Sequence, residues 1–330
     1  MRLTAYSAAH FLVDLSCALL VLGLLVPAGD AATVVLLYNF CAFALQMPLG
    51  LLADRLDRNH LTAASGCLLV LLAWILPGSL PAALAAGVGN ALFHVGGGLD
   101  TLHASAGRVG PLGVFVSPGA FGIYLGGLWS GGAAALALPI CLALAAFAAL
   151  LALGCRTGPS NGPAQLPADP GPLVPTLLCL FLVVVLRSWA GFLFAFPWKP
   201  QWGLALVCAT AFGKAAGGLL ADRFGPARTA AWTLALSTLC FLGSDLPGLG
   251  LAAVFLFNMT MPLTLWAAAR LLPHTRGFAF GLLTFALFLG FLPAYLGWTP
   301  LAPAPAVYAG AALASLTLLL PGLGKEPPPC

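Results

Sequence analysis

The chain has 330 residues, of which 61% are hydrophobic and 7% are charged, and its formal net charge is +4. Its mean hydropathy is +1.02. Soluble domains carry about 25% charged residues, so this composition excludes a soluble enzyme and a nucleic-acid-binding domain. It predicts an all-α protein embedded in the lipid bilayer, with no length left for a sizeable soluble domain, because each spanning helix needs about 20 residues.

Apolar runs bounded by Gly, Pro or charged residues predict twelve membrane-spanning helices. The first six cover residues 3–26, 31–53, 61–79, 82–103, 110–129 and 132–154, and the other six cover 173–197, 201–221, 229–246, 249–272, 278–297 and 302–322. A stretch rich in Pro and Gly separates the two sets. We therefore expect an N-terminal six-helix bundle (1–154), a cytoplasmic linker (155–172) and a C-terminal six-helix bundle (173–330).

A short sequence repeat relates these two parts. Residues 50–55 (GLLADR) return unchanged at 218–223, an offset of 168 positions, or about half the chain. The same offset aligns glycines and arginines in the later loops. Two similar halves with an even number of spans each are expected to be related by an axis along the membrane normal, which is a pattern of secondary transporters.

Basic residues predict the orientation of the chain, because Lys and Arg accumulate in cytoplasmic loops. With a cytoplasmic N-terminus, Lys199 alone lies outside, and the remaining loop cations lie inside: Arg2, Arg55, Arg58, Arg108, Arg156, Arg223, Arg228, Arg270, Arg276 and Lys325. Both termini are then cytoplasmic. The chain is rich in Ala, Gly, Leu and Pro and poor in Lys, which is typical of GC-rich bacteria and favours the inner (plasma) membrane.

The repeated loop resembles a known signature. Gly50-x-x-x-Asp54-Arg55-x-x-Arg58 is similar to the loop between the second and third helices of the major facilitator superfamily, and residues 218–223 are similar to its second-half copy. The resemblance implies a twelve-helix fold that works by alternating access. It also implies a cytoplasmic latch between the halves, made by Gly50, Asp54, Arg55, Arg58, Asp100, Gly218, Asp222 and Arg223. The alternative is that these charges only anchor helix ends, beside arginines that can pair with the two aspartates.

A second resemblance concerns the fourth and fifth spans. Residues 89–94 (GNALFH) and the pattern Gly113-x-x-x-Ser117-Pro118-Gly119-x-x-Gly122 resemble the fosmidomycin-resistance branch and the antiporter motif of drug exporters. Val95 stands where that branch has Pro, and Ser117 stands where the motif has Gly. The resemblance implies export of a small organic solute by proton antiport.

An acid and a base lie inside the first predicted span. His10 and Asp14 are four positions apart, so they share one helix face with their side chains within reach. Ionisable groups in a bilayer are costly, and each is a functional candidate by default. An imidazolium can stabilise a buried carboxylate, so the pair is the first candidate for proton coupling. The alternative is a satisfied polar contact between helices.

Two asparagines and a second histidine are candidates for contact with a solute. By the family resemblance, the first, fourth, seventh and tenth spans line a central cavity, which implies that Asn90 and His94 face the solute. His94 is also a second histidine for proton coupling with Asp14. The 168-residue offset aligns Asn258 with Asn90 and makes it the symmetric candidate. A hydrogen bond between packed helices is the alternative for Asn90 and His94.

Two cations lie within the seventh and eighth spans. Arg187 has no acid in its own helix, so we expect it to pair with Asp14 across the cavity or to bind an anionic substrate. Lys214 matches Gln46 in the other half, and we expect its ammonium to reach toward the cytoplasmic face.

No phosphate-binding loop, zinc spacing or nucleophile elbow occurs in the sequence. We therefore expect no enzyme activity, no cofactor and no metal, and a monomer whose partners are a small-molecule solute, protons and lipid. The first hypothesis is export by proton antiport. The alternatives are proton-coupled uptake of a small organic anion, favoured by Arg187, and a receptor or scaffold that transports nothing, which two intact signature loops argue against.

Overall fold

The computed structural model describes residues 2–155, 173–298 and 304–324, and this part of the chain is helical and without strands. The predicted linker lies outside the described residues except for Cys155. The first half contains α1 (Arg2–Leu20), η1 (Val21–Leu25), α2 (Val26–Ala28), α3 (Ala31–Asn39), η2 (Phe40–Ala44), α4 (Gln46–Leu56), α5 (Asn59–Ala73), α6 (Ser79–Ala104), α7 (Gly110–Val116), α8 (Pro118–Leu128), η3 (Ser130–Gly132) and α9 (Ala133–Gly154).

The second half repeats this arrangement with fewer interruptions. It contains α10 (Leu173–Leu193), α11 (Gly203–Phe224), α12 (Pro226–Leu242), α13 (Pro247–Asn258), α14 (Thr260–Leu271), α15 (Arg276–Tyr295) and α16 (Pro305–Leu323). Over the described residues, 10 helical segments are long and apolar enough to cross a membrane. The helices α5 (15 residues) and α12 (17 residues) occupy the predicted third and ninth places. The twelve-helix prediction is thus confirmed, with these two helices shorter than the rest.

Several predicted spans are built from more than one helical element. The turns η1 and η2 are π-helical, and the Leu45 N–H donates to the Phe40 carbonyl (3.3 Å) across the wider turn. Between α7 and α8, Pro118 has no backbone N–H to continue the hydrogen-bond ladder. Such interruptions do not change the direction of the spans, so the predicted order holds.

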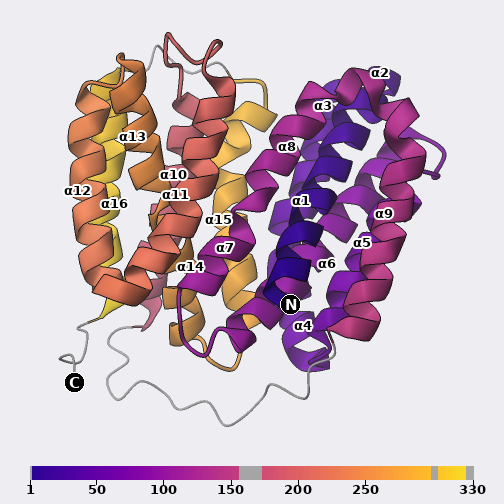
Figure 1. Cartoon of the computed structure of the whole chain (residues 1–330), viewed down its shortest axis with the longest axis horizontal. Coiled ribbons are helices and arrows are strands. Elements are labelled where there is room, and N and C mark those ends of the chain that lie inside the picture. Colours follow the sequence, from indigo (N-terminus) through magenta and orange to yellow (C-terminus); the bar gives the residue numbers. More distant parts are fainter. Residues whose placement is uncertain (1, 156–172, 299–303, 325–330) are drawn as a thin grey trace.

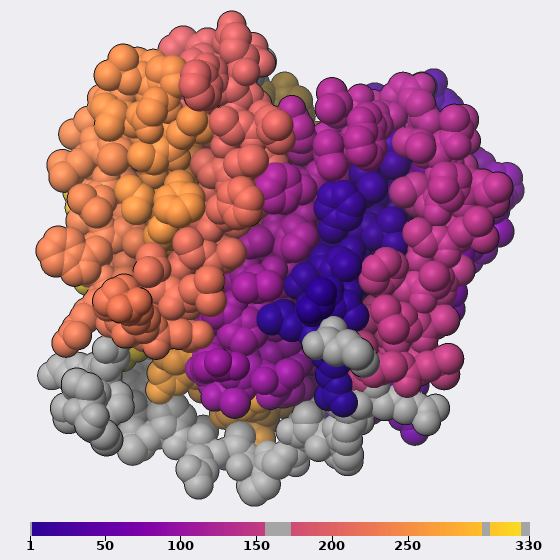
Figure 2. Space-filling view, in the orientation of Figure 1, coloured from indigo at the N-terminus to yellow at the C-terminus, as the bar shows by residue number. Residues whose placement is uncertain are grey.

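The helices form two groups, α1 to α9 and α10 to α16, and the start of α1 and the end of α16, which are the described chain ends, lie at the same end of the molecule (Figure 1). The groups meet where α4 packs on α15 and where α11 packs on α7. In the space-filling view the two groups touch along this face and are separated by a notch at the end away from the termini (Figure 2). The interface between the halves is therefore formed by α4 and α7 from the first half and by α11 and α15 from the second half.

Glycines allow the halves to approach closely near the end that carries the termini. A Cβ atom on Gly50 would collide with the carbonyl oxygen of Gly277 in α15. A Cβ atom on Gly218 would lie 2.9 Å from the Val109 carbonyl oxygen and 3.1 Å from the Gly110 Cα. Small residues at membrane helix contacts let backbones touch in this way. Backbone contact at both crossings closes this end of the interface.

Candidate functional site

A cavity of about 680 Å³ lies between the two halves and is lined by residues from both. Its wall is mainly apolar. Among the described residues, Asp14 is the only carboxylate that lines it. Its other polar and charged lining residues are His10, Tyr38, Asn39, Gln46, Asn90, His94, Arg187, Ser188, Thr210, Lys214, Thr284 and Tyr295. A concave, mostly apolar site with a few convergent polar groups is typical of small-molecule binding.

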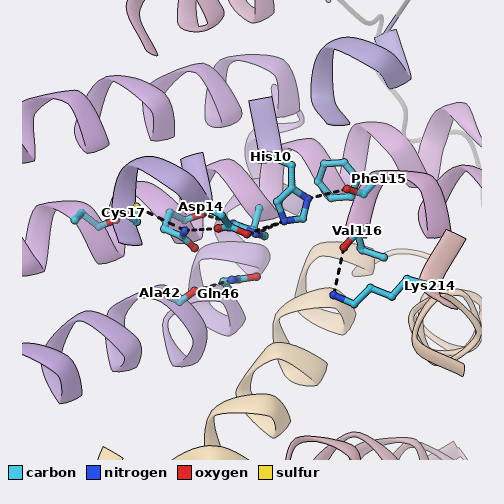
Figure 3. A network of polar contacts seen from close by, with 11 residues as sticks. His10, Asp14, Cys17, Ala42, Gln46, Phe115, Val116 and Lys214 are labelled. Carbon is cyan, nitrogen blue, oxygen red and sulfur yellow. Dashed lines mark hydrogen bonds and ion pairs between the residues drawn. The ribbon is translucent and has the colours of Figure 1, made fainter. Parts of the chain in front are cut away.

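Asp14 lies at the centre of a hydrogen-bonded cluster in the N-terminal half (Figure 3). Its Oδ2 is 3.2 Å from His10 Nε2, and its Oδ1 is 3.7 Å from His94 Nε2. Asn90 Nδ2 donates to Asp14 Oδ1 at 3.0 Å. The predicted contact between His10 and Asp14 on α1 is present. The structure adds that α6 brings both Asn90 and His94 to the same carboxylate.

Backbone carbonyls fix the orientation of both imidazole rings. His10 Nδ1 is 2.7 Å from the Phe115 carbonyl oxygen, and His94 Nδ1 is 2.9 Å from the Asn90 carbonyl oxygen. A carbonyl only accepts, so each Nδ1 carries a proton in this arrangement. The two Nε2 atoms lie 2.9 Å apart. At this distance the two Nε2 atoms can share one proton, next to the Asp14 carboxylate.

The two cations from the C-terminal half also line this cavity. The sequence analysis predicted that the Lys214 side chain reaches toward the cytoplasmic face, and this was wrong. Its Nζ instead donates to the Val116 carbonyl oxygen at 3.4 Å, beside the cavity (Figure 3). The position of Lys214 two turns before Asp222 was compatible with either direction. Within the described chain, Arg187 makes no ion pair with Asp14, whose oxygens are occupied by His10, His94 and Asn90.

Arg187 itself has an unused hydrogen-bond donor. The residue is 8% exposed, and its Nη1 atom has no partner among the described residues. A buried polar group without a partner costs free energy, and a charged one costs more. Of the two roles expected for Arg187, binding an anion is therefore compatible with this geometry, and an ion pair with Asp14 is absent from it.

Asn258 lies away from the main cavity. It borders a smaller cavity of about 250 Å³, which Arg187, Thr210 and Lys199 also line. Its amide Nδ2 donates to the Val254 carbonyl oxygen of its own helix at 2.9 Å. The helical ladder is interrupted at Met259, between α13 and α14, so the alignment with Asn90 does not carry over to an equivalent contact. Asn258 lies in the tenth span as predicted, but it borders the smaller cavity and not the main cavity in which the sequence analysis expected it.

The two repeated aspartates, Asp54 and Asp222, each make hydrogen bonds to the opposite half, at the end of the molecule where α1 starts and α16 ends. Asp54 accepts hydrogen bonds from the backbone N–H groups of Gly277 (2.8 Å) and Phe278 (2.9 Å) at the start of α15. Asp222 accepts them from Val109 (2.6 Å) and Gly110 (3.0 Å) at the start of α7. The first N–H groups of a helix lack partners within the helix and carry partial positive charge, so a carboxylate satisfies them well.

The sequence suggested that the arginines of the signature loops pair with Asp54 and Asp222. These arginines are not the hydrogen-bond partners of either aspartate. Arg55, Arg58 and Arg223 are exposed, and the Arg223 guanidinium lies 5.3 Å from the ring centroid of Phe224. Asp100 is buried within the N-terminal half and accepts a hydrogen bond from the Tyr6 hydroxyl. The partners of Asp54 and Asp222 are backbone amides, which no side-chain pattern reveals.

Several polar residues of the cavity were not recognised as site candidates from the sequence, and Gln46 is one of them. Gln46 lies on α4, its Nε2 donates to the Ala42 carbonyl oxygen at 2.6 Å, and its Oε1 is buried without a partner among the described residues. The signal that could have found it is the repeat, since the 168-residue offset aligns Gln46 with Lys214. Both members of this aligned pair line the cavity.

Comparison with known proteins gives a fold. No protein-family sequence model matches the chain, and no curated protein sequence matches it either. A solved structure of the transporter FucP in the outward conformation superposes with a TM-score of 0.70 at 13% identity, covering 98% of this chain and 99% of that one. The chain has the major facilitator superfamily fold.

Other solved structures with this major facilitator fold are similar over nearly the whole chain. The human organic anion transporter MFSD10 (TETRAN) has a TM-score of 0.64 at 17% identity, covering 96% of this chain and 98% of that one. A bacterial homologue of the iron transporter ferroportin, in the outward-facing state, has a TM-score of 0.63 at 14% identity, covering 98% and 97%. These likenesses confirm the expected major facilitator fold. The closer resemblance to the fosmidomycin-resistance branch stays a prediction.

Proposed function

We propose that this major facilitator protein is a secondary transporter that moves a small organic solute across the bilayer by alternating access. The halves 1–154 and 173–330 would tilt against each other around the cavity. The single observation that supports this most is that residues of both halves line one cavity, which is closed at one end by the crossed contacts of Asp54 and Asp222. A latch of this kind opens without unfolding either half.

We place the latch on the cytoplasmic side of a bacterial inner membrane, together with both termini. Arg55, Arg58, Arg223 and Arg228 lie at this end of the spans, where positive charge favours the cytoplasm. The cavity would then face outward in the present arrangement.

The cluster of His10, Asp14 and His94 is our candidate for the coupling proton. The two Nε2 atoms lie 2.9 Å apart, close enough to share one proton next to a carboxylate that lines the cavity. Such a proton can leave toward whichever side the cavity faces. The coupling ion is therefore held by the N-terminal half, on α1 and α6, while the solute contacts both halves.

Two directions of coupling are compatible with this site. Export by proton antiport follows from the resemblance of the fourth and fifth spans to drug exporters. Uptake of a small organic anion with a proton is the second candidate, favoured by the two cavity cations Arg187 and Lys214. A scaffold that transports nothing has no use for a reversible latch, so we propose transport.

The test uses purified protein in liposomes with an imposed pH gradient and three radiolabelled probes: a carboxylate (3-phenyllactate), a sugar (fucose) and a lipophilic cation (ethidium). We expect the gradient to drive movement of one class, and its direction separates antiport from symport. Asp14→Asn should abolish gradient-driven movement. The exposed Asp30→Asn is the matched control, because Asp30 only caps α3 through the Thr33 N–H (2.9 Å). Gradient-driven movement that survives in Asp14→Asn would remove the cluster from coupling.

A further inference from the structure

We infer that the solute of this cavity is a small hydroxycarboxylate with an apolar body, held by Arg187 and Lys214 on one half and by Gln46 on the other. This inference rests on the proposed transport function and names its substrate class. It follows from three features of the cavity wall in the described residues: Arg187 Nη1 and Gln46 Oε1 have no hydrogen-bond partner, and Lys214 has no ion-pair partner.

The charges of the cavity do not balance without a ligand. Arg187 and Lys214 are the two cations that come from the C-terminal half, and Asp14 is the only carboxylate lining the cavity among the described residues. Asp14 is already committed to two imidazoles and an amide. Among the described residues, Lys214 Nζ donates to the Val116 carbonyl oxygen at 3.4 Å and makes no ion pair. A bound anion supplies the missing negative charge.

The guanidinium of Arg187 supplies the geometry for a carboxylate. It is more than nine-tenths buried, borders both the main and the smaller cavity, and keeps Nη1 free of protein partners within the described residues. Guanidinium binds carboxylate through a planar fork, whereas an ammonium acts as a point charge. We therefore assign the carboxylate to Arg187, with Lys214 adding attraction that is less directional.

The side-chain amide of Gln46 has an oxygen that lacks a hydrogen-bond donor among the described residues. Its Nε2 is bonded to the Ala42 carbonyl oxygen, which fixes which end of the amide is free, and the buried Oε1 has no partner among the described residues. An acceptor left empty in the wall of a cavity is satisfied by a hydroxyl or N–H of a ligand. Because the two cations already exceed the free negative charge, a neutral hydroxyl fits better than an ammonium.

The rest of the wall defines the body of the solute. Between the polar groups the cavity is lined by aliphatic and aromatic side chains: Leu22, Ile123, Met261, Leu265, Leu283 and Phe291. Burial of an apolar body against such side chains supplies most of the binding free energy for small ligands. The ligand would span from α4 to α10 and α11, so one molecule contacts both halves.

Binding is tested on the full-length protein in detergent, without any gradient, using three matched probes: 3-phenyllactate, 3-phenylpropionate (no hydroxyl) and 3-phenyllactamide (no charge). A ligand that binds only the folded state raises the melting temperature by mass action. We expect 3-phenyllactate to stabilise most, 3-phenylpropionate less, and 3-phenyllactamide not at all. Equal stabilisation by the amide, or none by either acid at millimolar concentration, would overturn the proposal.

Variants assign the contacts. Arg187→Gln should weaken 3-phenyllactate binding at least about tenfold, as expected for a lost hydrogen bond to a charged group. Gln46→Leu should weaken 3-phenyllactate about fivefold and leave 3-phenylpropionate unchanged, since only the hydroxyl contact is lost. Arg228→Gln, at an exposed position on α12, is the control and should change neither. Unchanged affinity in Arg187→Gln would rule out the assignment.

The result also separates this inference from the proposed transport function. Binding of 3-phenyllactate without gradient-driven flux of any probe would support the hydroxycarboxylate site and contradict secondary transport. Gradient-driven flux of ethidium or fucose without binding of either acid would support transport and overturn the anion site. The two proposals therefore fail in different experiments.

Discussion

The Asp54 carboxylate accepts a hydrogen bond of 2.8 Å from the backbone N–H of Gly277, a residue 223 positions further along the chain. Asp222 makes the reciprocal contact with the start of α7. Each half of the molecule therefore caps a helix of the other. These bonds exist only while the two halves are together at this end, so their strength sets part of the balance between the two arrangements of the halves.

Replacing Asp54 with Asn should loosen this end. The asparagine Oδ1 can accept one of the two N–H bonds, but the charge that interacts favourably with the helix N-terminus is lost, which costs about 1 kcal/mol. We expect spin labels at the exposed positions Leu56 and His274, on opposite sides of the contact, to show a larger share of long distances. The same labels in Asp30→Asn should show no change, and an unaltered distribution in Asp54→Asn would contradict a latch.

Gly50→Ala should separate the same helices by steric means. The added Cβ would meet the carbonyl oxygen of Gly277, which is backbone and cannot rotate away. Forced close packing of this kind costs about 1–3 kcal/mol. We expect a lower melting temperature. We also expect thiol reagents added from the latch side to label the cysteines of the protein faster. Gly131→Ala is the matched control, because a Cβ there has nothing within 4 Å, and equal behaviour of the two variants would refute the tight contact.

His94→Gln tests the shared proton. The variant removes one of the two Nε2 atoms that lie 2.9 Å apart, so the proton between the rings loses its second site. We expect the number of protons moved per solute, measured with a pH-sensitive dye inside liposomes, to fall by at least half, while solute binding is retained. His274→Gln, at an exposed position, should leave the ratio unchanged. A normal proton count in His94→Gln would mean that His94 only packs.

Arg187→Met should stabilise the protein when no ligand is present. Its guanidinium is buried with an unused donor, and a buried charge without a counter-ion costs free energy that an apolar side chain does not. We therefore expect a higher melting temperature in ligand-free detergent solution. A structural ion pair would give the opposite sign, so a lower melting temperature in Arg187→Met, with Arg228→Met unchanged, would show that Arg187 has a protein partner.

The helices and their order could be predicted because they depend on local composition. Runs of apolar residues with Gly and Pro between them give the spans, and the exact return of residues 50–55 at 218–223 gives the two halves. The contact of His10 with Asp14 was also predictable, because a separation of four positions on a helix fixes it. In each case the information lies in the sequence itself, as local composition, as repetition or as spacing along one helix.

The partners across the cavity were not predictable in the same way. The amides that bind Asp54 and Asp222 have no side-chain identity, and they lie in the opposite half. The direction of the long Lys214 side chain depends on helix packing. Of the two roles expected for Arg187, the ion pair with Asp14 is absent from this arrangement, in which His94 and Asn90 contact that carboxylate. Asn258 shows that a sequence repeat does not guarantee a repeated contact.

The titratable cluster belongs to α1 and α6, whereas both cavity cations belong to α10 and α11. If the solute is a monoanion, the effect of membrane voltage on transport distinguishes symport with a proton from antiport against a proton. Co-transport of the anion with one proton moves no net charge, so voltage neither drives nor opposes it. Exchange of the same anion against one proton moves two elementary charges, worth about 5 kcal/mol per 100 mV. Current across the membrane would then distinguish import from export without the solute being labelled.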